Sequence, residues 1–332
     1  MENKELIPPG LSYLADNVKT KGNILGVSKK EGAVWAKGLD LPREKEIIFF
    51  AGCGYQFDTK LESMMGLIRK MDKSAIGAER AMGLASFQKK LGLDGMFMKV
   101  VGGSGKDDGQ PLIDAVKVLY KLGLTPGYLA ENEPCCGGIL HYMGEREAFV
   151  NHSKEVYAKL KSKGVKNIVG IVPSCTYTLS KLMSDAINGS DIEVKHFSQI
   201  LADNISSLTL RFPRQVKVTY HDPCQLVRYL GIVDEPRKIL KAISGIELVE
   251  TKWTKGEWST CCGGGGGFEA VFPEMSEMLA VNRTKELLET GAQIIVTHCP
   301  GCIMQLKAGL KSVKADNIEV LDLATVVAMS LV

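Results

Sequence analysis

Short runs of apolar residues, mostly β-branched or aromatic, alternate along the chain with longer segments whose apolar positions recur every three or four residues. The short runs are 46–52, 97–101, 167–172, 216–220, 246–250, 293–298 and 318–323. The longer segments include 111–122, 145–163, 235–244, 273–290 and 301–312. The short runs predict buried strands, and the longer segments predict amphipathic helices. Strands that alternate with helices favour an α/β fold of small parallel sheets flanked by helices.

The alternation divides the chain into two α/β units that join near 205–215. We expect a first domain at 46–210, a second at 211–332 and a preceding segment at 1–45. A helical insert at about 58–108 lengthens the first domain. It holds six of the thirteen methionines: Met64, Met65, Met71, Met82, Met96 and Met98. Three interpretations of the insert stay open: added core packing, a contact surface for a partner or apolar ligand, and binding to a membrane surface.

Composition and charge are those of a globular protein. Charged residues make up 24% of the chain and hydrophobic residues 45%, and the net charge is +3. This balance gives no argument for nucleic-acid binding. No apolar run reaches the roughly 18 residues that span a bilayer, although peripheral membrane association stays open. The first residues lack the basic and then apolar pattern of a secretory signal, so we expect a reducing, cytoplasmic location.

All nine cysteines belong to one pattern that is written twice. The second copy consists of Cys224, Cys261, Cys262, Cys299 and Cys302. The first copy consists of Cys53, Cys135, Cys136 and Cys175. In the second copy, 36 residues separate the first cysteine from the adjacent pair, and 36 separate that pair from the final C-P-G-C. Thiolates in such number and order are soft ligands that select iron–sulfur clusters or zinc.

Core filling and disulfide bonding both fit the cysteine pattern less well than metal binding does. Cysteines that only fill a core as small hydrophobes would not repeat or occur in adjacent pairs. A disulfide framework needs an oxidising compartment, and a bond between adjacent cysteines is strained. Metal binding is therefore the interpretation that the sequence favours.

Four of these cysteines follow a predicted strand. Cys53, Cys175, Cys224 and Cys299 each stand just beyond the end of one. Sites in parallel sheets gather outside the carboxyl ends of the strands, where helix N-termini favour negative charge. We therefore expect the thiolates of each copy to converge there.

A run of five glycines, 263–267, follows Cys262 directly. Glycine permits positive φ and close backbone approach, which two adjacent thiolates aimed at one metal group require. Gly263, Gly264 and Gly265 are therefore predicted to cradle the cofactor. A phosphate-binding loop is less well supported, because the run lacks the Lys-Ser/Thr ending of a P-loop; a linker is the remaining alternative.

The histidines next to the motifs have several possible roles. His221 and His298 lie beside Cys224 and Cys299, where each could hydrogen-bond a cluster sulfur, relay protons, or simply cap and pack. We count both as candidate cofactor-binding residues. His141, five residues after the first adjacent pair, is a candidate to complete the first site.

Several further polar residues give weaker indications. Asp222 and Arg228 are candidates to orient the second site, whereas His152 and His196 are expected at the surface. No Ser-His-Asp arrangement or paired-carboxylate motif is recognisable. We therefore assign no catalytic residue from the sequence.

The segments YHDPCQLVRYL, STCCGGGGGF and VTHCPGCIMQL resemble the cysteine-rich (CCG) domain of the heterodisulfide reductase family, and the resemblance covers roughly 46–332. The chain is also similar to iron–sulfur subunits of anaerobic glycerol phosphate dehydrogenase and of glycolate and lactate oxidation. In the catalytic subunit of heterodisulfide reductase, each complete five-cysteine motif holds a noncubane [4Fe–4S] cluster, and the paired sites reduce a disulfide. The resemblance implies such a cluster at the five cysteines of the second copy.

The first copy departs from the family pattern. Alignment of the two motif ends places Cys302 on Cys175 and Cys299 on Val172, so one ligand is missing. The four remaining cysteines imply either a second iron–sulfur cluster, of another type or with a borrowed ligand, or a zinc ion.

The segment before Cys53 looks like the linker that follows a ferredoxin-like module in some family members, yet no cysteine precedes Cys53. Electrons are therefore expected from ferredoxin-like or flavin-containing subunits, with 1–45 as either a docking segment or a disordered N-terminus. The resemblance implies an iron–sulfur redox subunit of an anaerobic oxidoreductase complex, reducing a disulfide or a similar acceptor. The alternative is a zinc–thiolate scaffold subunit without redox activity of its own.

Overall fold

Two parallel β-sheets form the centre of the molecule, as the computed structural model shows for the residues that it describes, 8–72 and 109–332. In this part of the chain the first sheet has the order β1-β2-β3, with strands Ile47–Phe50, Asn167–Gly170 and Glu193–His196. The second sheet has the order β5-β4-β6-β7, with β4 at Arg211–Tyr220, β5 at Ser244–Leu248, β6 at Ile294–Thr297 and β7 at Glu319–Asp322. Every pair of neighbouring strands is parallel, which confirms the predicted α/β class.

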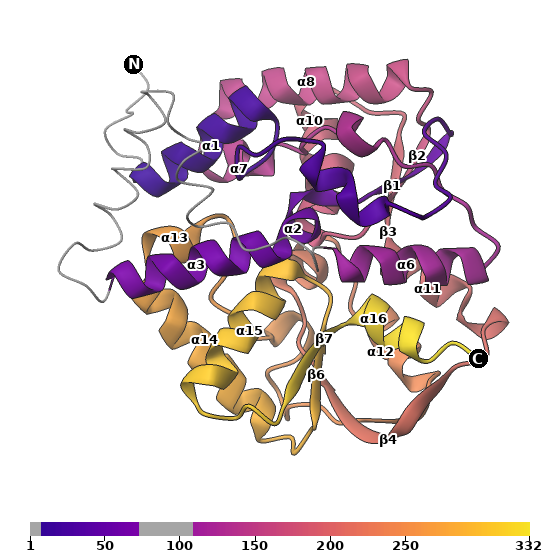
Figure 1. Ribbon diagram of the computed structural model, residues 1–332, viewed down its shortest axis with the longest axis vertical. Coiled ribbons are helices and arrows are strands. Elements are labelled where there is room, and N and C mark those ends of the chain that lie inside the picture. The colour runs from indigo at the N-terminus through magenta and orange to yellow at the C-terminus, as the bar shows by residue number, and fades with distance from the viewer. Residues whose placement is uncertain (1–7, 73–108) are drawn as a thin grey trace.

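Helices cover both sheets (Figure 1). In the first half they are α1 (Pro9–Lys21), α2 (Gly52–Gln56), α3 (Asp58–Asp72), α6 (Gln110–Lys121), α7 (Gly138–Tyr142), α8 (Arg146–Ser162), α9 (Pro173–Tyr177), α10 (Met183–Ala186) and α11 (Phe197–Asp203). In the second half they are α12 (Asp234–Lys241), α13 (Phe268–Val271), α14 (Pro273–Leu288), α15 (Pro300–Ser312) and α16 (Leu323–Met329). Two π-helical turns, Thr178–Leu182 and Gln225–Tyr229, follow closely after a cysteine of each motif.

The two sheets repeat one plan. In each sheet, the strand that leads to the first cysteine (β1 or β4) pairs with the strand that leads to the last part of the motif (β2 or β6). A third strand, β3 or β7, pairs with the other side of β2 or β6. Gly127 forms a single parallel bridge with Ile48, so the chain there takes the place beside β1 that β5 takes beside β4. This arrangement confirms the predicted pseudo-repeat.

The predicted elements agree with the structure except at the edges. All the predicted helices appear, and so do all the predicted strands that fall in the described residues. The run at 97–101 lies outside those residues. The pattern missed β3, because Glu193 and Lys195 are polar and face solvent at the edge of the first sheet.

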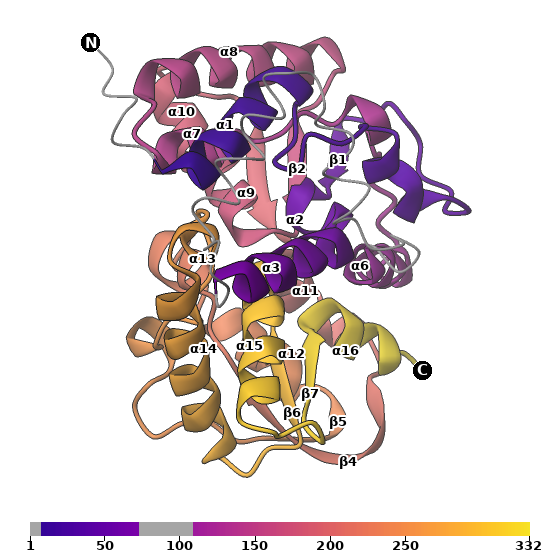
Figure 2. The same ribbon diagram turned by 60° about the vertical axis from the view of Figure 1, so that its left-hand side comes forward.

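One hydrophobic core extends through both sheets. Ile48 and Phe49 of the first sheet belong to the same cluster of buried side chains as Val218 and Ile294 of the second. The C-terminal helix α16 packs on α6 of the first unit, and Figure 2 shows the two units meeting along α2, α3 and α6. The cysteine-bearing ends of both sheets are therefore held in a fixed relation.

The described part of the N-terminal segment is folded onto the rest of the molecule. Leu14 and Val18 of α1 are buried, and α1 contacts α7 of the first unit and α13 of the second. Trp35 is also buried, and its indole N–H donates to the Tyr128 hydroxyl at 3.0 Å. A disordered N-terminus is therefore the wrong description of residues 8–45, while a docking role stays a prediction.

The described part of the insert also packs inside the molecule. Met64, Met65 and Ile68 of α3 are buried, and α3 lies against α13 and α14 of the second unit. Near the end of α3, Arg69 donates a hydrogen bond to Gln305. Core packing thus describes this part of the insert, and the remainder, 73–108, lies outside the described residues.

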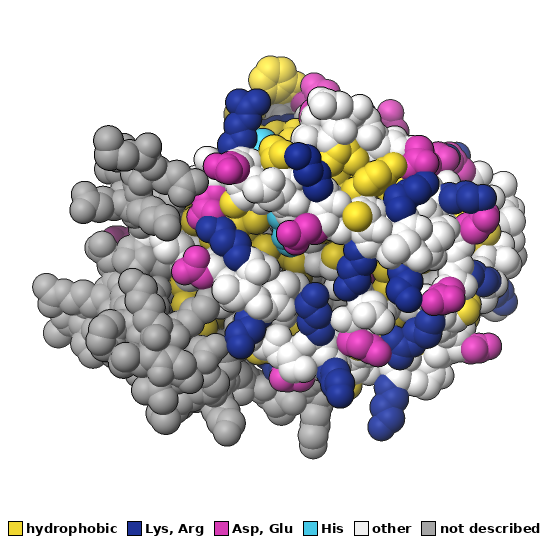
Figure 3. Space-filling model, turned by 90° about the horizontal axis from the view of Figure 1, so that it is seen from above, with side chains coloured by type: hydrophobic (Ala, Val, Ile, Leu, Met, Phe, Trp, Pro, Cys, Tyr) yellow, Lys and Arg dark blue, Asp and Glu magenta, His cyan; other side chains and the backbone are white. Residues whose placement is uncertain are grey.

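The surface carries charges of both signs. On the face seen in Figure 3, lysine and arginine side chains are interspersed with aspartate and glutamate. Among the described residues, no helix combines the length and the apolar character needed to cross a bilayer.

The close approach of the two units at Gly54 gives a stability prediction. A Cβ atom on Gly54 would lie 2.6 Å from Cγ of Pro300, which is a rigid ring at the start of α15. Gly54→Ala should therefore destabilise the protein by about 1–3 kcal/mol, because the helices must separate. Anaerobic denaturant unfolding measures the change.

Gly66→Ala in α3 is the matched control. Among the described residues nothing lies within 4 Å of a Cβ atom at position 66, so alanine should stabilise the helix by roughly 0.5–1 kcal/mol. An equal effect of the two substitutions would contradict the close packing of α2 on α15.

Candidate metal centres

The second copy of the cysteine pattern is assembled from three separate segments. Cys224 follows β4 and begins a π-helical turn, Cys299 caps the N-terminus of α15, and Cys302 lies in the first turn of that helix. Cys261 and Cys262 come from the loop between β5 and α13. The Sγ atoms of Cys262 and Cys302 are 3.2 Å apart, and the N–H of Gly263 donates to Sγ of Cys261 at 3.3 Å.

Four of these five thiols have shifted pKa values, and the fifth, Cys299, is among the neighbours that cause the shifts. Burial, followed by the charges of Cys299 and Cys262, raises the pKa of Cys224 to about 11. Hydrogen bonds from Cys261 and Cys302 lower the pKa of Cys262, while its proximity raises the pKa of both of those thiols. Five thiols so close together cannot all ionise unless a cation compensates their charge.

Two glycines let the backbone after Cys262 pass close to neighbouring helices, while their role in cradling the cofactor stays a prediction. Gly263 has φ +85°, and a Cβ atom there would collide with the carbonyl oxygen of Ser276. A Cβ atom on Gly264 would lie 2.7 Å from Cγ of Gln305, whereas one on Gly265 would meet no described atom within 4 Å. The backbone therefore passes close to α14 and α15 only because two side chains are absent.

The first copy forms a smaller set of thiols. Sγ of Cys53 lies 3.8 Å from Sγ of Cys135, and Sγ of Cys136 lies 3.4 Å from Sγ of Cys175. Val172 caps the N-terminus of α9 as Cys299 caps that of α15, so the two positions are equivalent. The first site thus contains four cysteines and a valine where the second has its fifth thiol.

The two sites face each other across the boundary between the sheets. The Tyr142 hydroxyl, near the first site, donates to Oε1 of Gln225 at 3.3 Å, and Gln225 follows Cys224. The rings of Tyr177 and Tyr229 lie 5.0 Å apart, one from each unit. Tyr55 of α2 donates to Asp322 at the end of β7. Residues beside one set of thiols therefore contact residues beside the other.

Comparison with known proteins agrees with this repeat. Residues 104–180 and 218–307 match the family profile of the cysteine-rich domain, CCG. The chain belongs to this cysteine-rich domain family. The two matched segments include all the cysteines except Cys53.

Relatives of the chain carry names of redox enzymes. It is 35% identical over 224 residues to a subunit of dihydromethanophenazine:CoB–CoM heterodisulfide reductase from Methanosarcina acetivorans, covering 65% of this chain and 54% of the relative. It is 34% identical over 221 residues to the EtfAB:quinone oxidoreductase of Syntrophomonas wolfei, covering 64% and 30%. It is 32% identical over 200 residues to a subunit of the CoM/CoB fumarate reductase from Methanothermobacter marburgensis, covering 58% and 39%. The chain thus spans about half the length, or less, of these relatives.

Among solved structures, a hypothetical protein from Helicobacter pylori has a similar fold. Its TM-score is 0.51 at 14% identity, and the match covers 67% of this chain and 46% of that one. This likeness supports the fold of the cysteine-rich domain pair and nothing beyond the fold.

The histidines of the cysteine-rich domains occupy different environments. Nδ1 of His221 lies 3.0 Å from Nε of Arg283, and the ligand atoms of His221, Cys262 and Cys302 all lie within 4.8 Å of one another. His298 instead contacts Asp322 through Nδ1 at 2.9 Å. His221 therefore lies beside thiols of the second copy, whereas the ring of His298 packs against His196 and Phe197 at the boundary between the units.

The remaining three histidines differ from the predictions in part. His196 is fully buried, so its prediction as a surface residue is wrong; it caps α11 and donates from Nε2 to the Ile171 carbonyl at 3.0 Å. His152 is half-buried and donates from Nε2 to the carbonyl of Cys135 at 2.8 Å. His141 is exposed, with its ring against Tyr142 and Phe149.

The two residues predicted to orient the second site do hold its loops. Asp222 is buried and accepts two hydrogen bonds from Arg237 at 2.8 Å, together with one from the N–H of Gly256. Arg228 donates to the carbonyls of Glu257 and Ser259. These bonds fix the segments that lead to Cys224 and Cys261.

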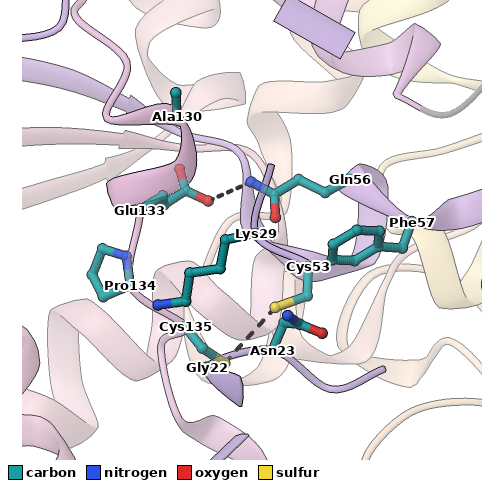
Figure 4. A pocket seen from close by; sticks show the side chains of 10 residues that line it. All are labelled: Gly22, Asn23, Lys29, Cys53, Gln56, Phe57, Ala130, Glu133, Pro134 and Cys135. Carbon is teal, nitrogen blue, oxygen red and sulfur yellow. Dashed lines mark hydrogen bonds between the residues drawn. The ribbon is translucent and has the colours of Figure 1, made fainter. Parts of the chain in front are cut away.

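Glu133 at the first site was missed by the sequence analysis. Its buried carboxylate accepts hydrogen bonds from the N–H groups of Ala51 and Gly52 at 2.8 and 2.9 Å and from Gln56, and so holds the loop that carries Cys53. Figure 4 shows the small pocket beside it, which Lys29 also lines. The position of Glu133, two residues before an adjacent cysteine pair, was the available signal.

Glu133 predicts a pH dependence of stability. Burial raises its pKa from 4.5 to about 8. Between these two pH values, the folded protein therefore keeps a proton that the unfolded chain has lost. The group therefore lowers the free energy of unfolding as the pH rises through this window, by up to about 1.4 kcal/mol per unit. Glu133→Gln should remove that contribution, and denaturant unfolding at about pH 6 and pH 8 should show a shallower slope than in the wild type.

Glu131→Gln is the control, because Glu131 is exposed and hydrogen bonding lowers the pKa of its carboxyl. This variant should keep the wild-type slope. An unchanged slope in Glu133→Gln would show that Glu133 has the same protonation in the folded and unfolded protein.

Proposed function

We propose that this chain is an iron–sulfur redox subunit of an anaerobic oxidoreductase complex. The five thiols that converge at Cys224, Cys261, Cys262, Cys299 and Cys302 carry the proposal. We infer a noncubane [4Fe–4S] cluster at this second site and a further iron–sulfur cluster at Cys53, Cys135, Cys136 and Cys175. The names of the relatives support redox chemistry, and the iron–sulfur cluster and its type come from the family resemblance.

The residues of the second site fit such a group. The donor set consists only of soft thiolates, and Gly263 and Gly264 let the adjoining backbone pack closely on α14 and α15. Nε2 of His221 is a buried polar atom without a partner in the described part of the chain, and a ring nitrogen of His221 lies within 4.8 Å of two of the thiols. A sulfur-rich anionic group would accept its hydrogen bond.

When bound, the cluster supplies one-electron chemistry, and the chain determines where that chemistry occurs. Cys262 and Cys302 are buried, whereas Cys261 is exposed, so the second site is open on one side. The exposed rings of Trp258 and Tyr229 belong to turns that contact each other near this opening. We infer that a partner centre approaches here.

The acceptor and the partners belong to the same proposal. Two facing sites suit delivery of two electrons to a disulfide or a similar acceptor. Within the described residues no nucleotide- or flavin-binding fingerprint occurs, so we propose that a ferredoxin-like or flavin-containing subunit provides the electrons. Thiolate ligands of this number favour a reducing location, which we propose to be cytoplasmic, with peripheral association at the cytoplasmic membrane face.

The four thiols of the first site support one alternative function, that of a zinc-binding structural subunit. A Cys₄ set suits tetrahedral zinc as well as iron–sulfur clusters. If zinc occupies both sites, the chain would be a structural scaffold. Iron, zinc and acid-labile sulfide in anaerobically purified protein distinguish the two functions, because colourless protein with two zinc ions would exclude the redox proposal.

Removal of one thiol from each site tests the ligand assignment. Cys302→Ser should lower the iron content by one cluster's worth, or make that cluster labile to oxygen, while the signal of the first site persists. Cys175→Ser should have the converse effect. Full iron and an unchanged electron paramagnetic resonance (EPR) spectrum in Cys302→Ser would contradict the assignment.

Addition of a thiol tests whether the sites differ through Val172. Cγ2 of Val172 and Sγ of Cys175 each lie 3.0 Å from the place of a Cβ atom on Gly52, so position 172 adjoins the first site. Val172→Cys should alter the EPR spectrum of the first site and leave that of the second unchanged. Val165→Cys adds a thiol in the buried core and should change neither spectrum; identical results for the two variants would refute a ligand position at 172.

A further inference from the structure

Arg283 is a fully buried arginine in α14, behind the second site. Its Nη1 donates to the carbonyl of Thr254 at 2.9 Å and forms an ion pair with Glu286 at 2.8 Å. Its Nε donates to Nδ1 of His221 at 3.0 Å. Its Nη2 has no partner in the described part of the chain. The guanidinium is therefore held firmly on one edge and directed at His221.

This contact decides which nitrogen of His221 carries the hydrogen. A guanidinium has N–H donors and no acceptor, so Nδ1 of His221 must accept and cannot carry a hydrogen. The hydrogen of the neutral ring is then on Nε2. Nε2 is buried and unpartnered in the described structure, and a ring nitrogen of His221 lies within 4.8 Å of Sγ of Cys262 and of Cys302. Because Nδ1 is occupied by Arg283, Nε2 is the nitrogen left for these thiols.

We propose that Arg283 is a positioning residue that fixes His221 as an Nε2–H donor to the sulfur atoms of the second metal centre. His221 is then not a metal ligand, although its distance to two cysteines alone would allow ligation. The redox part of this inference rests on the proposed function, whereas the assignment of the tautomer does not.

Within the residues that the structure describes, the first site has no counterpart of the Arg283–His221 pair. His221 stands three residues before Cys224, and the residue three before Cys53 is Phe50, which is buried and has no donor. An N–H bond to a cluster sulfur stabilises the more negative, reduced state and so raises the reduction potential. The charge of Arg283 acts in the same direction, and its ion pair with Glu286 reduces this part of the effect. The second centre should therefore accept electrons more readily than it would without these residues.

A redox titration monitored by EPR on the iron-loaded full chain tests the effect. His221→Phe gives the second site the residue found in the first, and it should shift the second-site potential downward at unchanged iron content. Arg283→Met should also shift it downward. Because Arg283 acts partly through His221, the double variant should shift it by less than the sum of the single changes. Arg214→Met removes an exposed arginine paired with Glu319 and should leave the potential unchanged.

A second measurement needs neither iron nor a substitution. In zinc-loaded, ¹⁵N-histidine-labelled full chain, the ring nitrogen shifts of His221 should show hydrogen on Nε2 and none on Nδ1. Arg283→Met should weaken that preference. An Nε2 without hydrogen in the wild type, or loss of the metal in His221→Phe, would make His221 a ligand and overturn the inference. An unchanged potential in His221→Phe would remove its redox role, while zinc-only native protein would refute the proposed function and leave the tautomer test valid.

Discussion

The convergence of thiols at the boundary between two parallel sheets is the constraint on which the rest of the structure depends. Thiols in such contact oppose one another's ionisation, as the raised pKa values of Cys224, Cys261 and Cys302 show. A cation relieves this opposition, and metal binding then contributes to folding. The strands, caps and turns near the cysteines serve to bring sulfur atoms from distant parts of the chain to one place.

Much of the remaining structure encloses these sites. The α1 helix contacts both units, and α3 lies against α13 and α14. Arg69 of α3 donates to Gln305, which donates to Ser276, and the Ser276 hydroxyl donates to the carbonyl of Gly263. A chain of hydrogen bonds thus links the described part of the insert to the glycine cradle. Packing of the insert and precision of the second site are therefore coupled.

The two sites share a plan but differ in their surroundings. The second has five thiols, a buried arginine and a histidine donor, whereas the first has four thiols and the buried carboxylate of Glu133. A cation and an N–H donor stabilise a more negative centre, whereas Glu133, whose pKa burial raises to about 8, is a neutral carboxyl below that pH. Under the proposed function, these surroundings would make the two sites differ in how readily they accept electrons.

The sequence by itself determined the α/β class, the repeat, the nine cysteines and the gap at Val172. These features are local, because strand periodicity, ligand chemistry and motif spacing are properties of short segments. Only the tertiary structure decided that Arg283 meets His221, 62 residues away, that Glu133 holds the loop of Cys53, and that His196 is buried. In the sequence, Arg283 is a polar residue of an amphipathic helix, and nothing local shows which face of that helix is covered. Burial and contact between distant segments give such residues their roles, and those arise only when the chain is folded.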